Sequence, residues 1–387
     1  MDNNNPISIR EFWRRKYNEI YKKVRKDVEE INEGKLPKDA SYILNGEKDM
    51  LSPNIIKLET KHGPIIIKET VCDTDEQIGE ASLGQSSLGD FKNEYETFMM
   101  LNQFSKLGYP HLATALDVIQ IVNKKPKYLM YNNQKYTKIG DKSPTKRNCY
   151  VVMPMAIMDA YTLMGSILIS SKLKQTEKKQ VIINILKQMI ISLYLFHKII
   201  KDYHCDTHSK NFFIFNNPYC SSSSYEFENG YKVNTSNLDK IKHDNLIGLD
   251  IVLYDFGRLG RASHQRMSSC KVPGYEYYRL FSTNTKSVVQ ILNDNKSLDN
   301  ENWGFLGDCW NLLRKSMGDS IINKENKWPD LPKESDIMLL SSSELTSLEE
   351  SEELAIGLLR ILDKEDINNT DPVCNYCLYR KQIKDSK

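Results

Sequence analysis

The sequence predicts an α+β protein, with a strand-rich first part that carries one helix and a mostly helical second part. Two observations lead to this fold class. Short runs of β-branched residues, bounded by glycine and proline, occupy about residues 40–70. Residues 176–200 are apolar on nearly every side of a helix, as in a buried helix, and the chain from about residue 275 reads as helices joined by polar loops.

Residues 8–33 are predicted to form one amphipathic helix. Ser8 and Glu11 have the spacing of a capping box, and Gly34 is a suitable stop. Apolar residues recur at spacings of three and four, at Trp13, Tyr17, Ile20, Tyr21, Val24, Val28 and Ile31. This stripe fits a helix packed on the domain behind it, and equally a helix that docks on a partner.

The rest of the first part should be a hairpin, a helix and two strands. The hairpin is expected over residues 55–60 and 64–68. The following elements are a polar loop at 71–90, a helix at 91–104, a strand at 119–121, a long loop at 123–148 and a strand at 150–153.

Two short apolar strands are expected after the long helix, at residues 212–215 and 251–254. The polar stretch between them, 216–246, is predicted to be a mobile insertion.

Two motifs in the second part point to chemistry. In the loop 203–211, Asp206 and Asn211 stand five residues apart, so a carboxylate can face a substrate hydroxyl while an amide reaches a metal. The second motif, Asp255-Phe256-Gly257, places an acid at the end of an apolar strand, before a glycine that lets the chain turn.

Together these motifs resemble the protein-kinase-like superfamily, most closely the divergent Ser/Thr protein kinases of large DNA viruses. His204, Asp206 and Asn211 match the catalytic loop, and Asp255 begins the metal-binding motif. The resemblance implies a two-lobed fold, with a small β-rich N-lobe and a larger helical C-lobe. The implied domains are a helical extension at 1–39, the N-lobe at 40–155, the C-lobe at 156–330 with insertion 216–246, and a helical C-terminal part at 331–387.

The resemblance also implies a site for ATP. Lys68, at the end of an apolar strand, would contact the α- and β-phosphates, and Glu94 fits better than Glu96 as its helical partner. Met153 would be the gatekeeper next to the adenine.

Three residues after that gatekeeper complete the nucleotide site that the resemblance implies. Pro154 and Ala156 would meet the adenine edge with a carbonyl and an N–H group. Asp159 fits a ribose contact, or alternatively the N-cap of a helix.

The same resemblance assigns the chemistry to four residues. Asp206 would orient the acceptor hydroxyl and take its proton, and His208 would touch the γ-phosphate. Asn211 and Asp255 would hold Mg²⁺, a cation that takes oxygen ligands. Asp308 would be a buried acid that braces the catalytic loop through backbone N–H groups, or alternatively a helix-start acid.

The chain departs from the kinase pattern in several places. A single glycine stands in the stretch 42–54, where a glycine-rich phosphate loop is expected. Cys205 replaces an arginine, which makes control by activation-loop phosphorylation unexpected, and His208 replaces a lysine, as in many small-molecule kinases. Glu276 belongs to the nearest candidate for an Ala-Pro-Glu motif.

Three functions remain open from the sequence. The first is an ATP- and Mg²⁺-dependent protein kinase, with a protein Ser/Thr substrate. The second is a small-molecule phosphotransferase of the aminoglycoside- or choline-kinase type, which His208 favours. The third is a pseudokinase scaffold, which the degenerate glycine loop favours.

Composition excludes several other classes. Lys plus Arg is 53 and Asp plus Glu is 51, a net charge of +2 that gives no support to nucleic-acid binding through a basic surface. No uninterrupted apolar run approaches the ~20 residues of a membrane span, and the N-terminus has no apolar leader core. The eight cysteines are scattered, with one close pair at Cys374 and Cys377, so reduced thiols and a cytoplasmic location, in a host cell or virion, are expected.

Overall fold

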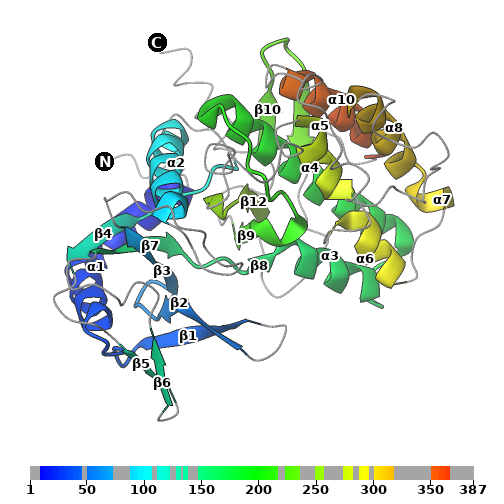
Figure 1. Ribbon diagram of the computed structural model, residues 1–387. Coiled ribbons are helices and arrows are strands. Elements are labelled where there is room, and N and C mark those ends of the chain that lie inside the picture. The colour runs from blue at the N-terminus through cyan, green and yellow to red at the C-terminus, as the bar shows by residue number, and fades with distance from the viewer. Residues whose placement is uncertain are drawn as a thin grey trace, which may run out of the picture. The chain divides into compact units, whose positions relative to one another are not determined.

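Two compact units make up the chain in the computed structural model (Figure 1). We call Ile9–Asn102 with Thr114–Met155 the strand-rich unit, and Gln103–Ala113 with Ala156–Lys387 the helical unit. This composition confirms the predicted α+β class. The structure describes residues 9–45, 50–72, 88–106, 111–122, 128–131, 134–137, 147–216, 223–235, 249–256, 273–281, 287–295, 300–317 and 350–366.

An antiparallel five-stranded sheet forms the centre of the strand-rich unit. Its strands, in spatial order, are β1 (Ala40–Asn45), β2 (Met50–Leu58), β3 (Ile65–Cys72), β7 (Arg147–Pro154) and β4 (Asp117–Val122). β3 lies in the middle of this order, with the side chains of Ile65 and Ile67 fully buried. A central strand has neighbours on both sides, so Lys68 on β3 is held in a fixed place.

Part of the region predicted as a long loop at 123–148 is a second hairpin. The strands β5 (Tyr128–Tyr131) and β6 (Gln134–Thr137) pair antiparallel, and β7 already begins at Arg147. The prediction of one continuous loop was therefore wrong for these residues, because strands of only four residues within a polar stretch give a weak sequence pattern.

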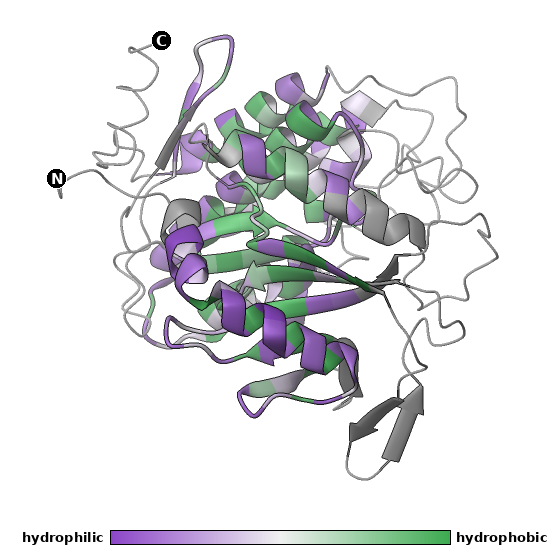
Figure 2. Cartoon of the chain, turned by 90° about the vertical axis from the view of Figure 1, so that its left-hand side faces the viewer, coloured by the Kyte–Doolittle hydropathy of each residue, from purple (hydrophilic) through white to green (hydrophobic). Residues whose placement is uncertain are grey.

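Helix α1 (Ile9–Asn32) packs on the sheet of the strand-rich unit. Val24 and Val28 are fully buried in one cluster with Ile56 from β2. Polar and apolar residues alternate along α1 in Figure 2, as the amphipathic pattern predicts. The helix ends at Asn32, and Gly34 follows with a φ of 81° that suits a residue without a Cβ. The interpretation as a packed helix accounts for the apolar stripe except Tyr21, which is exposed.

The helical unit is built around α4 (Gln175–Ile200), which is buried along almost its whole length. By length and composition α4 is apolar enough to cross a membrane, but 94% of its most apolar window is buried inside the protein, as in the core helix of a folded domain. The other helices of this unit are α3 (Ala160–Ile169), α5 (Pro273–Phe281), α6 (Val288–Asp294), α7 (Asn300–Trp303), α8 (Phe305–Met317) and α10 (Glu350–Glu365).

Two small sheets complete the helical unit. One has the order β12-β9-β8, from β12 (Leu249–Leu253), β9 (Phe212–Asn216) and β8 (Met158–Asp159). The other pairs β10 (Ser223–Glu226) with β11 (Lys232–Thr235), inside the insertion predicted to be mobile. Tyr225 and Phe227 of this hairpin are buried against Tyr194 of α4. These described residues are therefore a packed hairpin within the insertion, and the mobility of the insertion stays a prediction.

Some expectations lie outside the described residues: Ser8, nearly all of the loop 71–90, Gly257, and the pair Cys374 and Cys377. The predicted domain boundaries stay predictions.

Candidate active site

Lys68 and Glu94 form an ion pair within the strand-rich unit. Nζ of Lys68, on β3, lies 3.0 Å from Oε1 of Glu94, on α2 (Leu88–Lys106). The Glu94 side chain is 3% exposed, whereas Glu96 is exposed to solvent. A carboxylate that is buried to this extent needs a cationic partner, and Lys68 supplies it. The structure thus joins the two residues that the sequence analysis paired.

The end of β7 carries the predicted adenine-contacting residues. Met153 is buried, and Pro154 pairs with Ile65 of β3 in the sheet register. The next residue, Met155, donates its N–H to the carbonyl of Pro64 at 3.3 Å. Ala156 is the first residue of the helical unit in this region. The adenine contacts of Met153, Pro154 and Ala156 stay predictions.

Asp159 is the N-cap of α3. Its Oδ1 accepts the backbone N–H of Thr162 at 2.8 Å, and its Oδ2 accepts the Thr162 hydroxyl at 2.9 Å. This is one of the two interpretations that the sequence left open. A ribose contact by Asp159 stays a prediction.

The 203–211 loop holds Asp206 and Asn211 in a closed arrangement. Nδ2 of Asn211 donates to the backbone carbonyl of Asp206 at 2.8 Å, and the Asn211 N–H donates to the carbonyl of His208 at 2.9 Å. Asp206 is 8% exposed and Asn211 is 7% exposed. These bonds fix the backbone that follows Asp206, from its own carbonyl to that of His208.

Strand register brings Asp255 next to Asn211. Phe212 of β9 pairs with Leu253 of β12, and the N–H of Tyr254 donates to the carbonyl of Asn211 at 2.9 Å. Asp255 follows directly, with an exposed side chain and a φ of 65°. An amide and a carboxylate are the hard oxygen donors that Mg²⁺ takes while it keeps several waters. The donor set therefore fits Mg²⁺, although no cluster of three or more His, Cys, Asp or Glu occurs among the described residues.

The Asp255 motif is packed against the 203–211 loop through aromatic side chains. Nε2 of His204 lies 2.9 Å from the carbonyl of Tyr254. The ring of Phe256 stacks on Phe196 of α4 at 5.6 Å and meets His204 edge-on at 5.7 Å. His204 thus connects both motifs to the core of the helical unit. Its ring packs against Phe196 and Phe256, and its Nε2 contacts the carbonyl of Tyr254.

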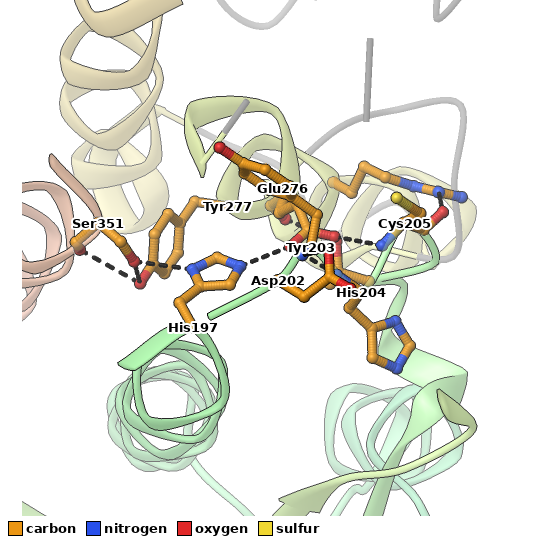
Figure 3. A network of polar contacts seen from close by, with 10 residues as sticks. His197, Asp202, Tyr203, His204, Cys205, Glu276, Tyr277 and Ser351 are labelled. Carbon is orange, nitrogen blue, oxygen red and sulfur yellow. Dashed lines mark hydrogen bonds and ion pairs between the residues drawn. The ribbon is translucent and has the colours of Figure 1, made fainter. Parts of the chain in front are cut away.

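A buried acid braces the 203–211 loop, but it is Glu276 on α5 and not Asp308 (Figure 3). Oε2 of Glu276 accepts the N–H of His204 at 3.0 Å, and Oε1 accepts the N–H of Cys205 at 2.5 Å. Glu276 is fully buried, whereas Asp308, on α8, is exposed. The sequence analysis was wrong about Asp308, because a Gly-Asp-x-Trp pattern does not distinguish a buried acid from an acid in the first turn of a helix.

Further groups anchor Glu276 itself. Nε2 of His197, on α4, lies 2.5 Å from Oε2 of Glu276, and Nδ1 of the same ring lies 2.7 Å from the hydroxyl of Ser351 on α10 (Figure 3). Burial, together with the charge of Glu276, raises the pKa of Tyr203 to about 12. The acid is therefore held from two sides, by backbone N–H groups of the 203–211 loop and by the imidazole ring of His197.

Asp206 has two basic side chains at one carboxylate oxygen. Nη2 of Arg279, on α5, lies 3.3 Å from Oδ1, and Nε2 of His208 lies 3.6 Å from the same atom. His208 was predicted from the sequence, but Arg279 was missed. The sequence did contain an indication of this buried arginine. Glu276 and Arg279 stand among the aromatic residues of the run 275–281, and charged residues among large apolar side chains are usually buried and paired.

Two cysteines expected to be reduced are disulfide-bonded. They are Cys205 in the 203–211 loop and Cys149 on β7. Cys309, on α8, is a free thiol whose pKa burial raises well above its usual range. The expectation of reduced thiols was therefore wrong for Cys149 and Cys205, because the positions of cysteines in a sequence do not reveal which of them form disulfides.

The five-stranded antiparallel sheet of the strand-rich unit and the helices of the helical unit confirm the predicted α+β fold class. No protein-family model and no curated protein sequence matches the chain. Among solved structures, 349 chains match. One is a ROP18 kinase domain in complex with AMP-PNP and sucrose, with 9% identity, a TM-score of 0.41, and coverage of 96% of this chain and 95% of that chain. The likeness is distant, so function has to be inferred from this chain's own residues.

Proposed function

We propose that this chain catalyses Mg²⁺-dependent transfer of the γ-phosphoryl group of ATP to a hydroxyl of a protein, with serine or threonine as the acceptor. The closed arrangement of the 203–211 loop carries the proposal. Asn211 bonds the backbone of Asp206 and also neighbours Asp255 through the strand register. Phosphoryl transfer asks a protein mainly for such positioning and for charge stabilisation.

Asp206 orients the acceptor hydroxyl and accepts its proton as the phosphoryl group is transferred. Its orientation matters more than its basicity, because the hydroxyl has to approach in line with the leaving oxygen. Asn211 fixes the backbone after Asp206, and Glu276 fixes the backbone N–H groups before it, and together these bonds supply that orientation.

Asn211 and Asp255 would hold Mg²⁺ through their side-chain oxygens. When bound, this ion neutralises charge on the phosphate oxygens. Asp255 contributes a full negative charge and an exposed position, and both suit a ligand that arrives together with a nucleotide. Asn211 contributes a neutral oxygen while its Nδ2 keeps the bond to Asp206.

Lys68 would contact the α- and β-phosphates, with Glu94 fixing its otherwise flexible side chain. Met153, Pro154 and Ala156 would meet the adenine, and His208 would touch the γ-phosphate. These assignments rest on the resemblance, and the ion pair of Lys68 supports the first of them.

Transfer to a small alcohol is the second candidate. The position of His208, 3.6 Å from Oδ1 of Asp206, favours it, because the histidine stands beside the acceptor-binding carboxylate. A protein acceptor is favoured by the helices α5, α8 and α10, which carry many buried side chains. Such a helical C-terminal part is typical of protein kinases.

A radioactive transfer assay tests the proposal. The full-length protein is incubated with γ-labelled ATP and either Mg²⁺ or EDTA, with mixed proteins or mixed small alcohols as acceptors and Asp206→Asn as the blank. Label on serine or threonine of added protein, lost with EDTA and in Asp206→Asn, is the expected result. Label only on small alcohols would replace the proposal with the second candidate, and absence of transfer from a folded wild type would make the chain a scaffold.

A further inference from the structure

Arg279 contacts both the backbone and the side chain of the 203–211 loop. Its Nη1 donates to the carbonyl of Cys205 at 3.1 Å, and its Nη2 lies 3.3 Å from Oδ1 of Asp206. The residue is 8% exposed. A guanidinium group has donors in a rigid fork, so one arginine can hold two acceptors in fixed relation. Here the two acceptors are the carboxylate proposed to receive the proton and the peptide group directly before it.

The backbone that Arg279 holds is strained. Cys205 has a φ of 61°, a left-handed conformation that costs a residue with a side chain about 1 kcal/mol. Its N–H donates to Glu276, and its carbonyl accepts from Arg279, so α5 grips the peptide groups on both sides of the strained residue. Such a conformation persists only where its surroundings determine it.

We propose that Arg279 is a positioning residue for Asp206, a role that rests on the proposed phosphoryl transfer. It holds Oδ1 of the carboxylate and the peptide group before it, which sets the direction in which Asp206 faces the acceptor hydroxyl. Glu276 lies one helical turn earlier on α5. Within the 203–211 loop its carboxylate accepts only backbone N–H groups, those of His204 and Cys205. Arg279 alone on this helix reaches both the backbone and the carboxylate among the described contacts.

The test compares three variants of Arg279 with wild type. Arg279→Met removes the fork, and kcat is expected to fall about 30-fold while the KM for ATP stays within about twofold, since misplacement of a reacting group affects the chemical step. Arg279→Lys keeps the charge without the fork and should recover only part of the loss. Adding millimolar guanidinium to Arg279→Ala should raise kcat several-fold, which a purely structural defect would not allow.

Arg360→Met is the matched control, because Arg360 is an exposed helical arginine on α10 that stacks on Tyr231. Its kcat should equal that of wild type. Two results would overturn the positioning role. One is a kcat of Arg279→Met within threefold of wild type, and the other is a loss of kcat that neither Arg279→Lys nor added guanidinium relieves.

A wild type without transfer activity would overturn the proposed function itself. The contact of Arg279 is then judged by amide hydrogen exchange over residues 202–208. Faster exchange there in Arg279→Met, with α5 unchanged, supports the hold on the loop, and unchanged exchange refutes it.

Discussion

At the scale of single residues, each side chain that we propose to contact substrate is held in place by a neighbouring side chain. Asp206 is oriented by Asn211 from within the 203–211 loop. Lys68 is held in the same way by Glu94 in the strand-rich unit. In both pairs the loss of the second residue should affect catalysis, because the first residue would be free to move.

Replacing Lys68 with methionine tests the phosphate-binding role proposed for this lysine. Lys68→Met should lower kcat/KM about a thousandfold, because charge stabilisation of the phosphates is lost. Lys57→Met, on the adjacent strand β2, is the control: Lys57 pairs with the exposed Glu59 and should be replaceable within about twofold. Steady-state kinetics at varied ATP measure both, and near-normal turnover of Lys68→Met would refute the assignment.

Residues within local motifs were predictable from the sequence, whereas residues that reach a motif from elsewhere were not. Asp206 and Asn211 stand five residues apart in one loop, and Lys68 and Glu94 are positions that the kinase resemblance implies in short local patterns. Glu276 acts across about 70 positions, and nothing local indicates which backbone N–H groups it will meet. The choice of Asp308 failed for this reason.

At the scale of elements, α5 is the support of the 203–211 loop, and α10 supports α4. The carboxylate and the carbonyl of Glu276 meet the loop from α5, with Thr207 donating its hydroxyl to that carbonyl at 2.8 Å. Lys187, fully buried on α4, forms ion pairs of 2.5 and 2.6 Å with Asp363 and Asp366 at the end of α10. Single charged residues thus join elements that the sequence separates widely.

Glu276→Gln should weaken the hydrogen bonds that hold the 203–211 loop without creating a cavity. The amide keeps the size of the side chain but loses the charge that accepts two N–H bonds, so we expect a loss of about 2 kcal/mol in the free energy of unfolding and at least about tenfold in kcat. Urea unfolding and initial rates measure the two effects. Asp308→Asn removes an exposed acid and should leave both quantities unchanged; the reverse pattern would restore the sequence-based choice of Asp308.

Lys187→Met should be among the most destabilising single changes. It leaves two carboxylates beside a buried apolar side chain, and the loss of one partner from a buried ionic group costs about 3–5 kcal/mol. The triple variant Lys187→Met, Asp363→Asn, Asp366→Asn should recover much of this loss. A single variant as stable as wild type in urea would show that the carboxylates do not depend on Lys187.

At the scale of the whole molecule, the order of strands and helices could be predicted, and several details could not. The hydrophobic patterns of α1, α4 and the hairpin of β2 and β3 were strong enough to place them to within a few residues. The hairpins β5-β6 and β10-β11 escaped prediction, because their short strands are surrounded by polar sequence. A net charge of +2 leaves almost no long-range field, so the choice of acceptor has to depend on local surfaces.

Buried tyrosines in both units should make the protein sensitive to alkali. Burial raises the pKa of six tyrosines above the ordinary value near 10, to about 12 for Tyr42 and for Tyr203. The other four are Tyr17, Tyr194, Tyr231 and Tyr277.

The native state keeps these phenol protons where the unfolded chain releases them. The stability they contribute is therefore complete below pH 10 and is lost as the pH rises from about 10 to 12. Urea midpoints at pH 8, 9, 10 and 11 measure this loss, and a midpoint that is constant to pH 11 would contradict it.

The central claim is that Asp206 serves γ-phosphoryl transfer from the 203–211 loop. The most direct measurement is the single-turnover rate of transfer from labelled ATP with Mg²⁺, for Asp206→Asn beside Asp308→Asn. Both variants exchange one acidic side chain for its amide, and only the first alters the proposed acceptor of the proton. We predict that Asp206→Asn loses at least about a hundredfold in rate while Asp308→Asn equals wild type; equal rates for both variants would contradict the account.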